Sequence, residues 1–122
     1  MRRRHADRGL SGSVQLAVLL PFAIGIFLLL LQWSLVTWAE ATALAAAQES
    51  ARAAAAYDGS EAVGAASGAG VAGNGSLTGV KVIVDRGPRQ TTATVTGTAV
   101  VVLWPRAVSQ TASAATERVT TP

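Results

Sequence analysis

The sequence predicts an α+β protein in which one long helix precedes a small antiparallel β-sheet. An apolar run begins near residue 14, an alanine-rich stretch without helix breakers follows it, and the last third alternates valine with polar residues. With 122 residues the chain has room for one domain, and the part beyond the apolar run is short for a self-sufficient core. We therefore expect a membrane or neighbouring subunits to help stabilise it.

The apolar run predicts a transmembrane helix over residues 14–38. From Leu16 to Leu31 no residue is more polar than glycine, and the run extends further if Gln32 and Ser34 are tolerated. About 20 apolar residues are needed to cross the roughly 30 Å hydrocarbon core of a bilayer. The run is therefore long enough to span a membrane with some tilt.

Three side chains add detail to this helix. Trp33 and Trp38 lie near its far end, where indole rings favour the membrane interface, so we expect them to act as interface anchors. Pro21 lies inside the run and removes one backbone donor. It predicts either a bend in the helix or its first turn.

Residues 1–13 form a basic arm, or a leader, before the apolar run. Against the single carboxylate of Asp7 stand four arginines, namely Arg2, Arg3, Arg4 and Arg8. This excess predicts a cytoplasmic N-terminus, and hence a single-pass protein of the cell membrane with an extracytoplasmic C-terminal part. Nucleic-acid binding would also use such a cluster, but beside an apolar helix we expect membrane orientation and no nucleic-acid partner.

The alanine-rich residues 39–58 predict a helical extension beyond the membrane. Alanine has the best intrinsic helix propensity, and Glu49 with Arg52 forms an i,i+3 ion pair. The small side chains let another element approach closely. Packing against a sheet or a sister helix is expected.

Residues 59–79 predict a short helix followed by a glycine-rich loop. Gly59 is suited to end the preceding helix, and Ser60 is suited to cap the next one. Alanines recur on roughly one face of the short helix. From Gly68 to Gly79 glycine, serine and asparagine predominate, which predicts a loop.

Residues 80–122 predict a β-hairpin or meander of two to three strands. Valines alternate with polar residues from Val80 to Asp85, and threonines alternate with small and apolar residues in "TTATVTGTAVVVL". The stretch "RGPRQ" between them predicts a hairpin connection, and "WP" ends the second strand. Residues 108–119 supply either a third strand or a loose tail.

The composition argues against an enzyme. The chain has no cysteine, one histidine and only seven carboxylates, so disulfides and thiolate metal sites are excluded. His5 lies in the basic arm without a partner motif, and the carboxylates fit solvated helix faces and caps. The glycines of "GAASGAGVAGNG" follow no strand and lack the "GK[ST]" of a phosphate loop. We expect no catalytic residue, no metal and no cofactor.

One motif resembles a known family. Asp7-Arg8-Gly9, followed after a short gap by "VQLAVLLP" at residues 14–21, resembles the N-terminus of TadE-like proteins. These are pseudopilins or minor pilins of Flp-type (tight adherence) pilus systems, with Arg-Gly, Val-Glu-x-Ala-x-x-x-Pro and a leucine-rich membrane helix. The spacing from Gln15 to Pro21 matches the family's spacing from glutamate to proline. The ending "QTASAATER" is similar to that of actinobacterial members.

The resemblance implies a pilin-like fold and a structural role in Flp-type pilus assembly, cell adhesion or related secretion. The partners it implies are the membrane, other pilin-like subunits, assembly platform proteins and a prepilin peptidase. Gln15 occupies the position of the family's glutamate, which in type IV pilin-like proteins pairs with a neighbouring subunit's N-terminal amine; Gln15 would set helix register and Pro21 helix shape. Prepilin peptidase cuts after glycine, so Gly9 and Gly12 are the processing candidates. Cleavage at them places Gln15 at the sixth or the third mature position, not at the family's fifth.

A second function stays open from the residues alone. The protein could be a small secreted binding protein whose signal peptide is cut near Ala39-Glu40-Ala41 or Ala43-Leu44-Ala45. The apolar run is longer than the roughly 7 to 15 residues of such signals. The alanine-rich helix also continues through both proposed cuts, which favours retention of the helix.

Overall fold

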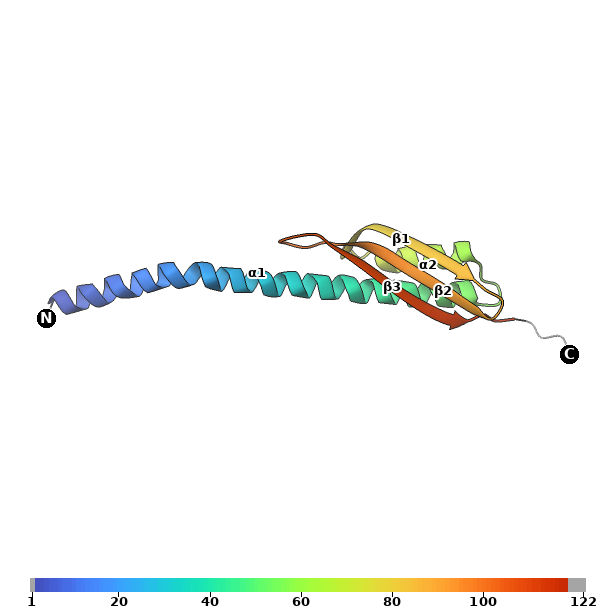
Figure 1. Ribbon diagram of the computed structural model, residues 1–122, viewed down its shortest axis with the longest axis horizontal. Coiled ribbons are helices and arrows are strands. Elements are labelled where there is room, and N and C mark those ends of the chain that lie inside the picture. Colours follow the sequence, from blue (N-terminus) through green and yellow to red (C-terminus); the bar gives the residue numbers. More distant parts are fainter. Residues whose placement is uncertain (1, 119–122) are drawn as a thin grey trace.

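A long helix carries a small α+β layer on its C-terminal half (Figure 1). The computed structural model describes residues 2–118, with side chains from residue 12 onwards. Its elements, in chain order, are α1 (Arg2–Ala55), α2 (Glu61–Ala72), β1 (Leu77–Arg86), β2 (Gln90–Ala99) and β3 (Arg106–Ala115). The strands form one antiparallel sheet in the order β1-β2-β3. The predicted α+β class, with its long N-terminal helix and small antiparallel sheet, is confirmed.

Helix α1 is continuous from the basic arm through the apolar run and into the alanine-rich stretch. Pro21 lies inside it and not in its first turn, so of the two roles that the sequence left open only a bend remains. Figure 1 shows a gentle change of direction in the blue half of the helix, which is the half that contains Pro21. A proline lacks the N–H of one helical hydrogen bond, which is a common cause of such bends.

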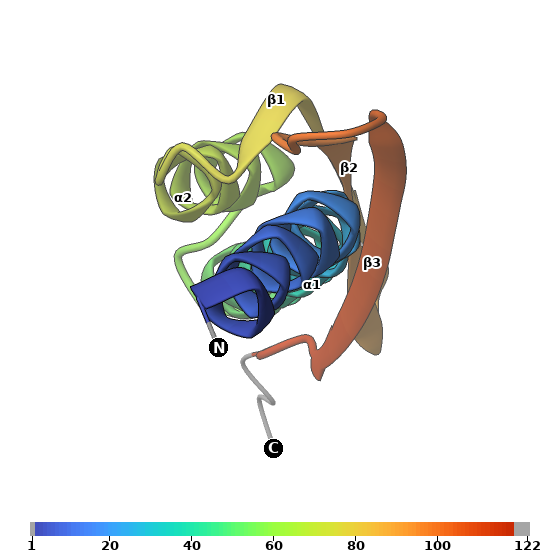
Figure 2. The same ribbon diagram turned by 90° about the vertical axis from the view of Figure 1, so that its left-hand side faces the viewer.

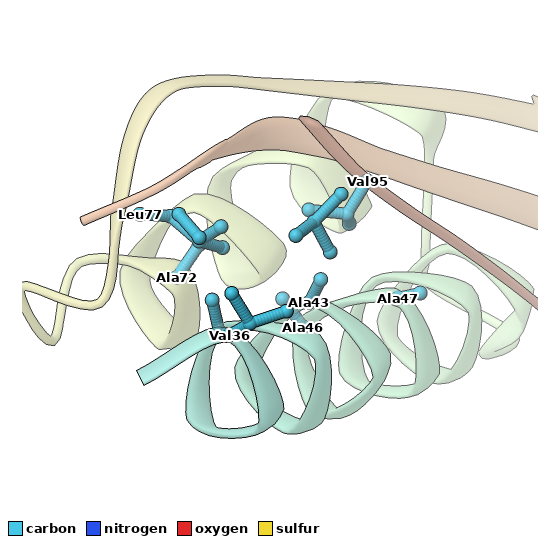
Figure 3. Close-up of a cluster of buried hydrophobic side chains, with 10 residues drawn as sticks. Val36, Ala43, Ala46, Ala47, Ala72, Leu77 and Val95 are labelled. Atoms are coloured by element: carbon cyan, nitrogen blue, oxygen red, sulfur yellow. The ribbon is translucent and has the colours of Figure 1, made fainter. Parts of the chain in front are cut away.

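The C-terminal half of α1 is lined by alanines that the sheet and α2 bury. Ala39, Ala43, Ala46 and Ala47 have no exposed surface. Figure 3 shows Val95 of β2 above this row of small side chains. Because alanine adds only one carbon beyond the backbone, the sheet can lie close against the helix, as the alanine-rich composition predicts.

Helix α2 packs against α1 through glycine. Figure 2 looks along α1 and shows α2 on one side of it and the sheet on another. The buried residues of α2 are Gly64, Gly68 and Ala72, spaced four apart on one face. A Cβ on Gly64 would lie 2.5 Å from the Cβ of Ala54, and the Ser50 hydroxyl donates a 2.8 Å hydrogen bond to the Gly64 carbonyl.

This packing corrects two expectations for residues 59–79. The alanines expected to share a face point mostly to solvent, and glycines form the buried face because only they allow this approach. The helix also continues to Ala72, past the Gly68 at which a loop was expected. Ser60 caps its start as predicted, accepting a 3.1 Å hydrogen bond from the backbone N–H of Val63.

The sheet presents an apolar face to α1 and a threonine-rich face to solvent. Thr91, Ala93, Val95 and Ala99 of β2 are buried, while the threonines between them lie on the outer side. The stretch after the second strand does form a third strand, which settles the alternative left open for residues 108–119.

The second strand ends earlier than expected. The prediction extended it to the "WP" dipeptide, but β2 stops at Ala99 and residues 100–105 leave the sheet. This segment has no strand partner. A side chain of α1 forms hydrogen bonds with its backbone instead.

The far end of α1 is closed by the C-terminal segment. The backbone N–H of Glu117 donates to the Ala55 carbonyl over 2.8 Å, and the Glu117 carboxylate accepts from the backbone N–H of Tyr57 over 3.0 Å. The Arg86 guanidinium donates to the Ala56 carbonyl over 3.3 Å. The N–H of Glu117 thus pairs a carbonyl that the helix end leaves without an intrahelical partner.

Candidate functional site

Within residues 2–118 no other element covers the N-terminal half of α1, and its surface is apolar. Apart from Leu28, the large hydrophobic side chains from Val14 to Leu30 are 50–68% exposed. Soluble monomers rarely expose an apolar patch of more than a few hundred Å². The described part of the chain has one helix long and apolar enough to cross a membrane, and it is this one.

The residues predicted for assembly lie along this exposed surface. Gln15 and Gly12 are exposed near its start, and a Cβ on Gly12 would meet nothing within 4 Å. Pro21 follows Gln15 by six residues, which places the two roughly 120° apart around the helix axis. The structure therefore does not bring Gln15 and Pro21 onto one face.

The basic arm and Gly9 belong to the first turns of α1. The side chains of Arg2, Arg3, Arg4 and Arg8 lie outside the residues whose side chains the structure describes. Of the two predicted interface anchors, Trp33 is 70% exposed, and Trp38 is partly covered at 45%. Both lie where the exposed helix meets the folded domain.

Gln32 marks the point at which α1 becomes covered. This side chain is only 4% exposed. Its Nε2 donates to the carbonyl of Trp104 over 3.0 Å, and its Oε1 accepts from the backbone N–H groups of Val102 and Leu103 over 3.2 and 3.1 Å. One amide thus pairs three backbone groups of residues 100–105, which we call the junction loop.

The junction loop is apolar and exposed although it connects two strands. It reads "VVVLWP", and Val100, Val102, Leu103 and Trp104 are 41–53% exposed. Figure 1 shows this connection between β2 and β3 extending further along α1 toward the N-terminus than the strands themselves. The carbonyl of Trp104 is bonded to Gln32, which precedes Trp33 in the chain.

Sequence reasoning missed this contact. It treated Gln32 as a tolerated polar residue and Trp104 as the end of a strand, and the bonded groups lie 70 to 72 positions apart. The available signal was the apolar run itself, because a connection exposed to water is seldom six apolar residues long.

Among the ionisable groups, one ion pair lies on the half of α1 that the domain covers. Arg52 donates to the carboxylate of Glu49 on the exposed face of α1, as the i,i+3 spacing predicts. This hydrogen bond and the carboxylate's charge raise the pKa of Arg52. Among the described residues no three histidine, cysteine or carboxylate side chains gather where they could hold a metal.

A comparison with known families adds an independent observation. Residues 11–52 match the family model described as TadE-like protein. No curated protein and no solved structure matches the chain. The matched segment contains Gln15 and Pro21, the exposed apolar surface, Gln32 and most of the buried alanine face. The resemblance seen in the N-terminal motif is confirmed by this match: residues 11–52 of the chain are similar to the TadE-like family.

Proposed function

We propose that this protein is a membrane-anchored pseudopilin or minor pilin that takes part in assembling a Flp-type pilus or a related secretion machine. The observation that carries the proposal is the TadE-like match over a helix whose first half is bare and apolar and whose second half is the core of a small domain. The TadE-like match supports a pilin-like, structural role in a tight adherence system. The anchoring and the particular role are the proposal.

The division of α1 supports a membrane-spanning segment at residues 12–31. These 20 residues are about 30 Å long as a helix, which matches a hydrocarbon core. From Gln32 onwards one side of the helix is buried in protein, and Val36 and Ala39 belong to the core. The proposed span is therefore shorter at its far end than the residues 14–38 expected from hydropathy.

The proposed orientation places the N-terminus in the cytoplasm. The arginines before the span outnumber the acidic residues there, and the next charged residue in the chain is Glu40. The sheet then lies outside the cytoplasm, next to the membrane. Other pilin-like subunits and platform proteins would meet the bare helix surface laterally.

Gln15 and Pro21 have distinct proposed roles in this association. An amide among lipid-facing helices gains about 0.6 to 2 kcal/mol by bonding across to another helix. Gln15 therefore sets register between subunits, and Pro21 sets the bend of the helix. A prepilin peptidase that cuts after Gly9 or Gly12 would leave Gln15 in the mature chain.

The buried core argues against the alternative of a small secreted binding protein with a cleaved signal peptide. A cut after Ala41 or Ala45 would remove Gln32, Val36 and Ala39, and with them the support of the junction loop and of the inner face of the sheet. The domain would then expose apolar surface that it now buries.

N-terminal sequencing of the protein from its native membranes tests the proposal. A start at Leu10 or Ser13 fits pilin processing, and an intact Met1 fits a permanent anchor. A start between residues 42 and 48 refutes both. Photocrosslinkers placed at Leu19, which is exposed, should capture pilin-like subunits or platform proteins, whereas one at exposed Gln48 on the domain half of α1 should capture fewer.

A further inference from the structure

We infer that the junction loop is a second membrane-contacting element, which lies in the interface of the bilayer that α1 spans and sets the depth of the domain. The inference rests on the proposed anchoring. It adds that the sheet domain is seated on lipid and not held away from it.

The position of the loop is the first argument. Gln32 follows directly on the proposed span, and its side chain bonds to the loop backbone. If residues 12–31 fill the hydrocarbon core, the loop therefore lies at the boundary of that core, within one side chain's reach of the helix. No strand of the sheet extends as far along α1 as this loop (Figure 1).

The surface at this level is the second argument. Trp33 and Trp104 are both largely exposed, together with Val102 and Leu103 of the loop. Indole rings favour the membrane interface, where the ring is in an apolar environment and the N–H can meet a polar headgroup. The exposed loop thus continues the apolar surface of the span.

The charges are the third argument. Between Arg8 and Glu40 the chain has no charged residue, and the junction loop has none before Arg106. Glu40 follows Gln32 in the half of α1 that the domain covers, and Arg106 is the first residue of β3. The lipid-facing level is thus free of charge, and charged groups begin where headgroups and water begin.

The hydrogen bonds of Gln32 are the fourth and strongest argument. A backbone N–H or C=O that enters lipid without a partner costs several kcal/mol, so irregular backbone is excluded there unless protein groups satisfy it. Gln32 pairs the N–H groups of Val102 and Leu103 and the carbonyl of Trp104. In water these groups would find partners without help, whereas in lipid Gln32 removes the cost of leaving these three groups unpaired.

The absence of native cysteine allows the inference to be tested with single spin labels on the full-length protein. We would introduce Leu103→Cys, Ile26→Cys and Ser109→Cys one at a time, label each, and dilute it with unlabelled protein in phosphatidylcholine and phosphatidylglycerol vesicles. Accessibility to oxygen, which concentrates in lipid, is compared with accessibility to a neutral nickel chelate, which stays in water. Ile26 tests the span, and exposed Ser109 on the outer face of β3 is the matched aqueous control.

The expected result is that the label at residue 103 favours oxygen several-fold over the label at residue 109, though less than the label at residue 26. If residue 103 behaves like residue 109 while residue 26 reports lipid, the inference fails and the proposed anchoring stands. If residue 26 also reports water, both fail. If residue 103 is shielded from both reagents, and the shielding disappears at higher dilution, a second copy covers the loop and the inference is overturned.

The role of Gln32 is tested with the same label. Gln32→Leu removes all three hydrogen bonds, so the oxygen preference at residue 103 should fall to the value at residue 109 while the label becomes more mobile. Gln48→Leu makes the same change at an exposed position of the same helix and should leave residue 103 unchanged. Equal signals at residue 103 in the two variants would refute the role of the amide, provided that circular dichroism shows both domains folded.

Discussion

The glycine face of α2 leads to a prediction in which one substitution has opposite effects at two positions of the same helix. Gly64→Ala places a methyl group 2.5 Å from the Cβ of Ala54 and 2.7 Å from the carbonyl oxygen of Ser50. Real Cβ atoms essentially never approach within 3.0 Å, so α2 must move away from α1. Gly70→Ala places the same methyl group where nothing lies within 4 Å.

The magnitude follows from three contributions. Overpacking costs about 1 to 3 kcal/mol, and weakening the bond from the Ser50 hydroxyl to the Gly64 carbonyl costs about 1 kcal/mol more. Replacing glycine by alanine stabilises a helix by about 1 kcal/mol, which offsets part of this loss. Gly64→Ala should therefore lower the free energy of unfolding by about 2 kcal/mol, whereas Gly70→Ala should raise it by about 0.5 to 1 kcal/mol.

Urea unfolding of the full chain in mild detergent, followed by circular dichroism, measures both changes. Thermal unfolding should agree, because 2 kcal/mol in a domain of this size corresponds to a fall in Tm of roughly 10 °C. The reasoning is refuted if the two substitutions shift stability in the same direction, since helix propensity alone would stabilise both.

Three further predictions concern the other contacts. Gln15→Glu should preserve or strengthen crosslinking between helices in membranes and Gln15→Leu should weaken it, and equal crosslinking by all three proteins would remove the proposed role. Asn74→Ala should lower the free energy of unfolding, measured in urea, by about 1 to 2 kcal/mol, because this amide bonds to Thr42 over 2.8 Å and to the buried Ser76 over 2.6 Å. An unchanged midpoint of urea unfolding would contradict this. Because the pKa of Arg52 is raised, its pairing with Glu49 stabilises the fold below the ordinary arginine pKa and is lost only as pH rises through the raised value. Arg52→Gln should therefore change Tm by the same amount at pH 7 and pH 9. A different change at the two pH values would argue against this assignment.

Much of the architecture could be predicted because it follows hydrophobic period and propensity. The unbroken apolar and alanine-rich stretches predict one long helix, and the alternation around Val82 and Val95 predicts paired strands; the two valines do face each other in the register. These signals are local, since each depends on residues a few positions apart.

The contacts that hold the domain to the helix could not be predicted in the same way. The buried positions of Gly64 and Gly68 could not be predicted, because a sequence shows the cost of glycine in a helix and not the neighbour that requires it. Gln32 and the junction loop are separated by about 70 positions, and neither forms a recognisable motif alone. Their meeting depends on where β2 stops, which is itself a result of the packing.

The continuity of α1 couples the orientation of the domain to the tilt of the bare half of the helix. No turn separates the bare half of the helix from the half that is the core of the domain, so the two cannot change direction independently. Residues 32–55 extend about 36 Å beyond the proposed span, and a helix tilt of about 20° therefore moves their far end sideways by roughly 12 Å. If α1 spans the bilayer as proposed, a small rearrangement among packed helices inside it would be amplified into a large displacement of the threonine-rich face outside it.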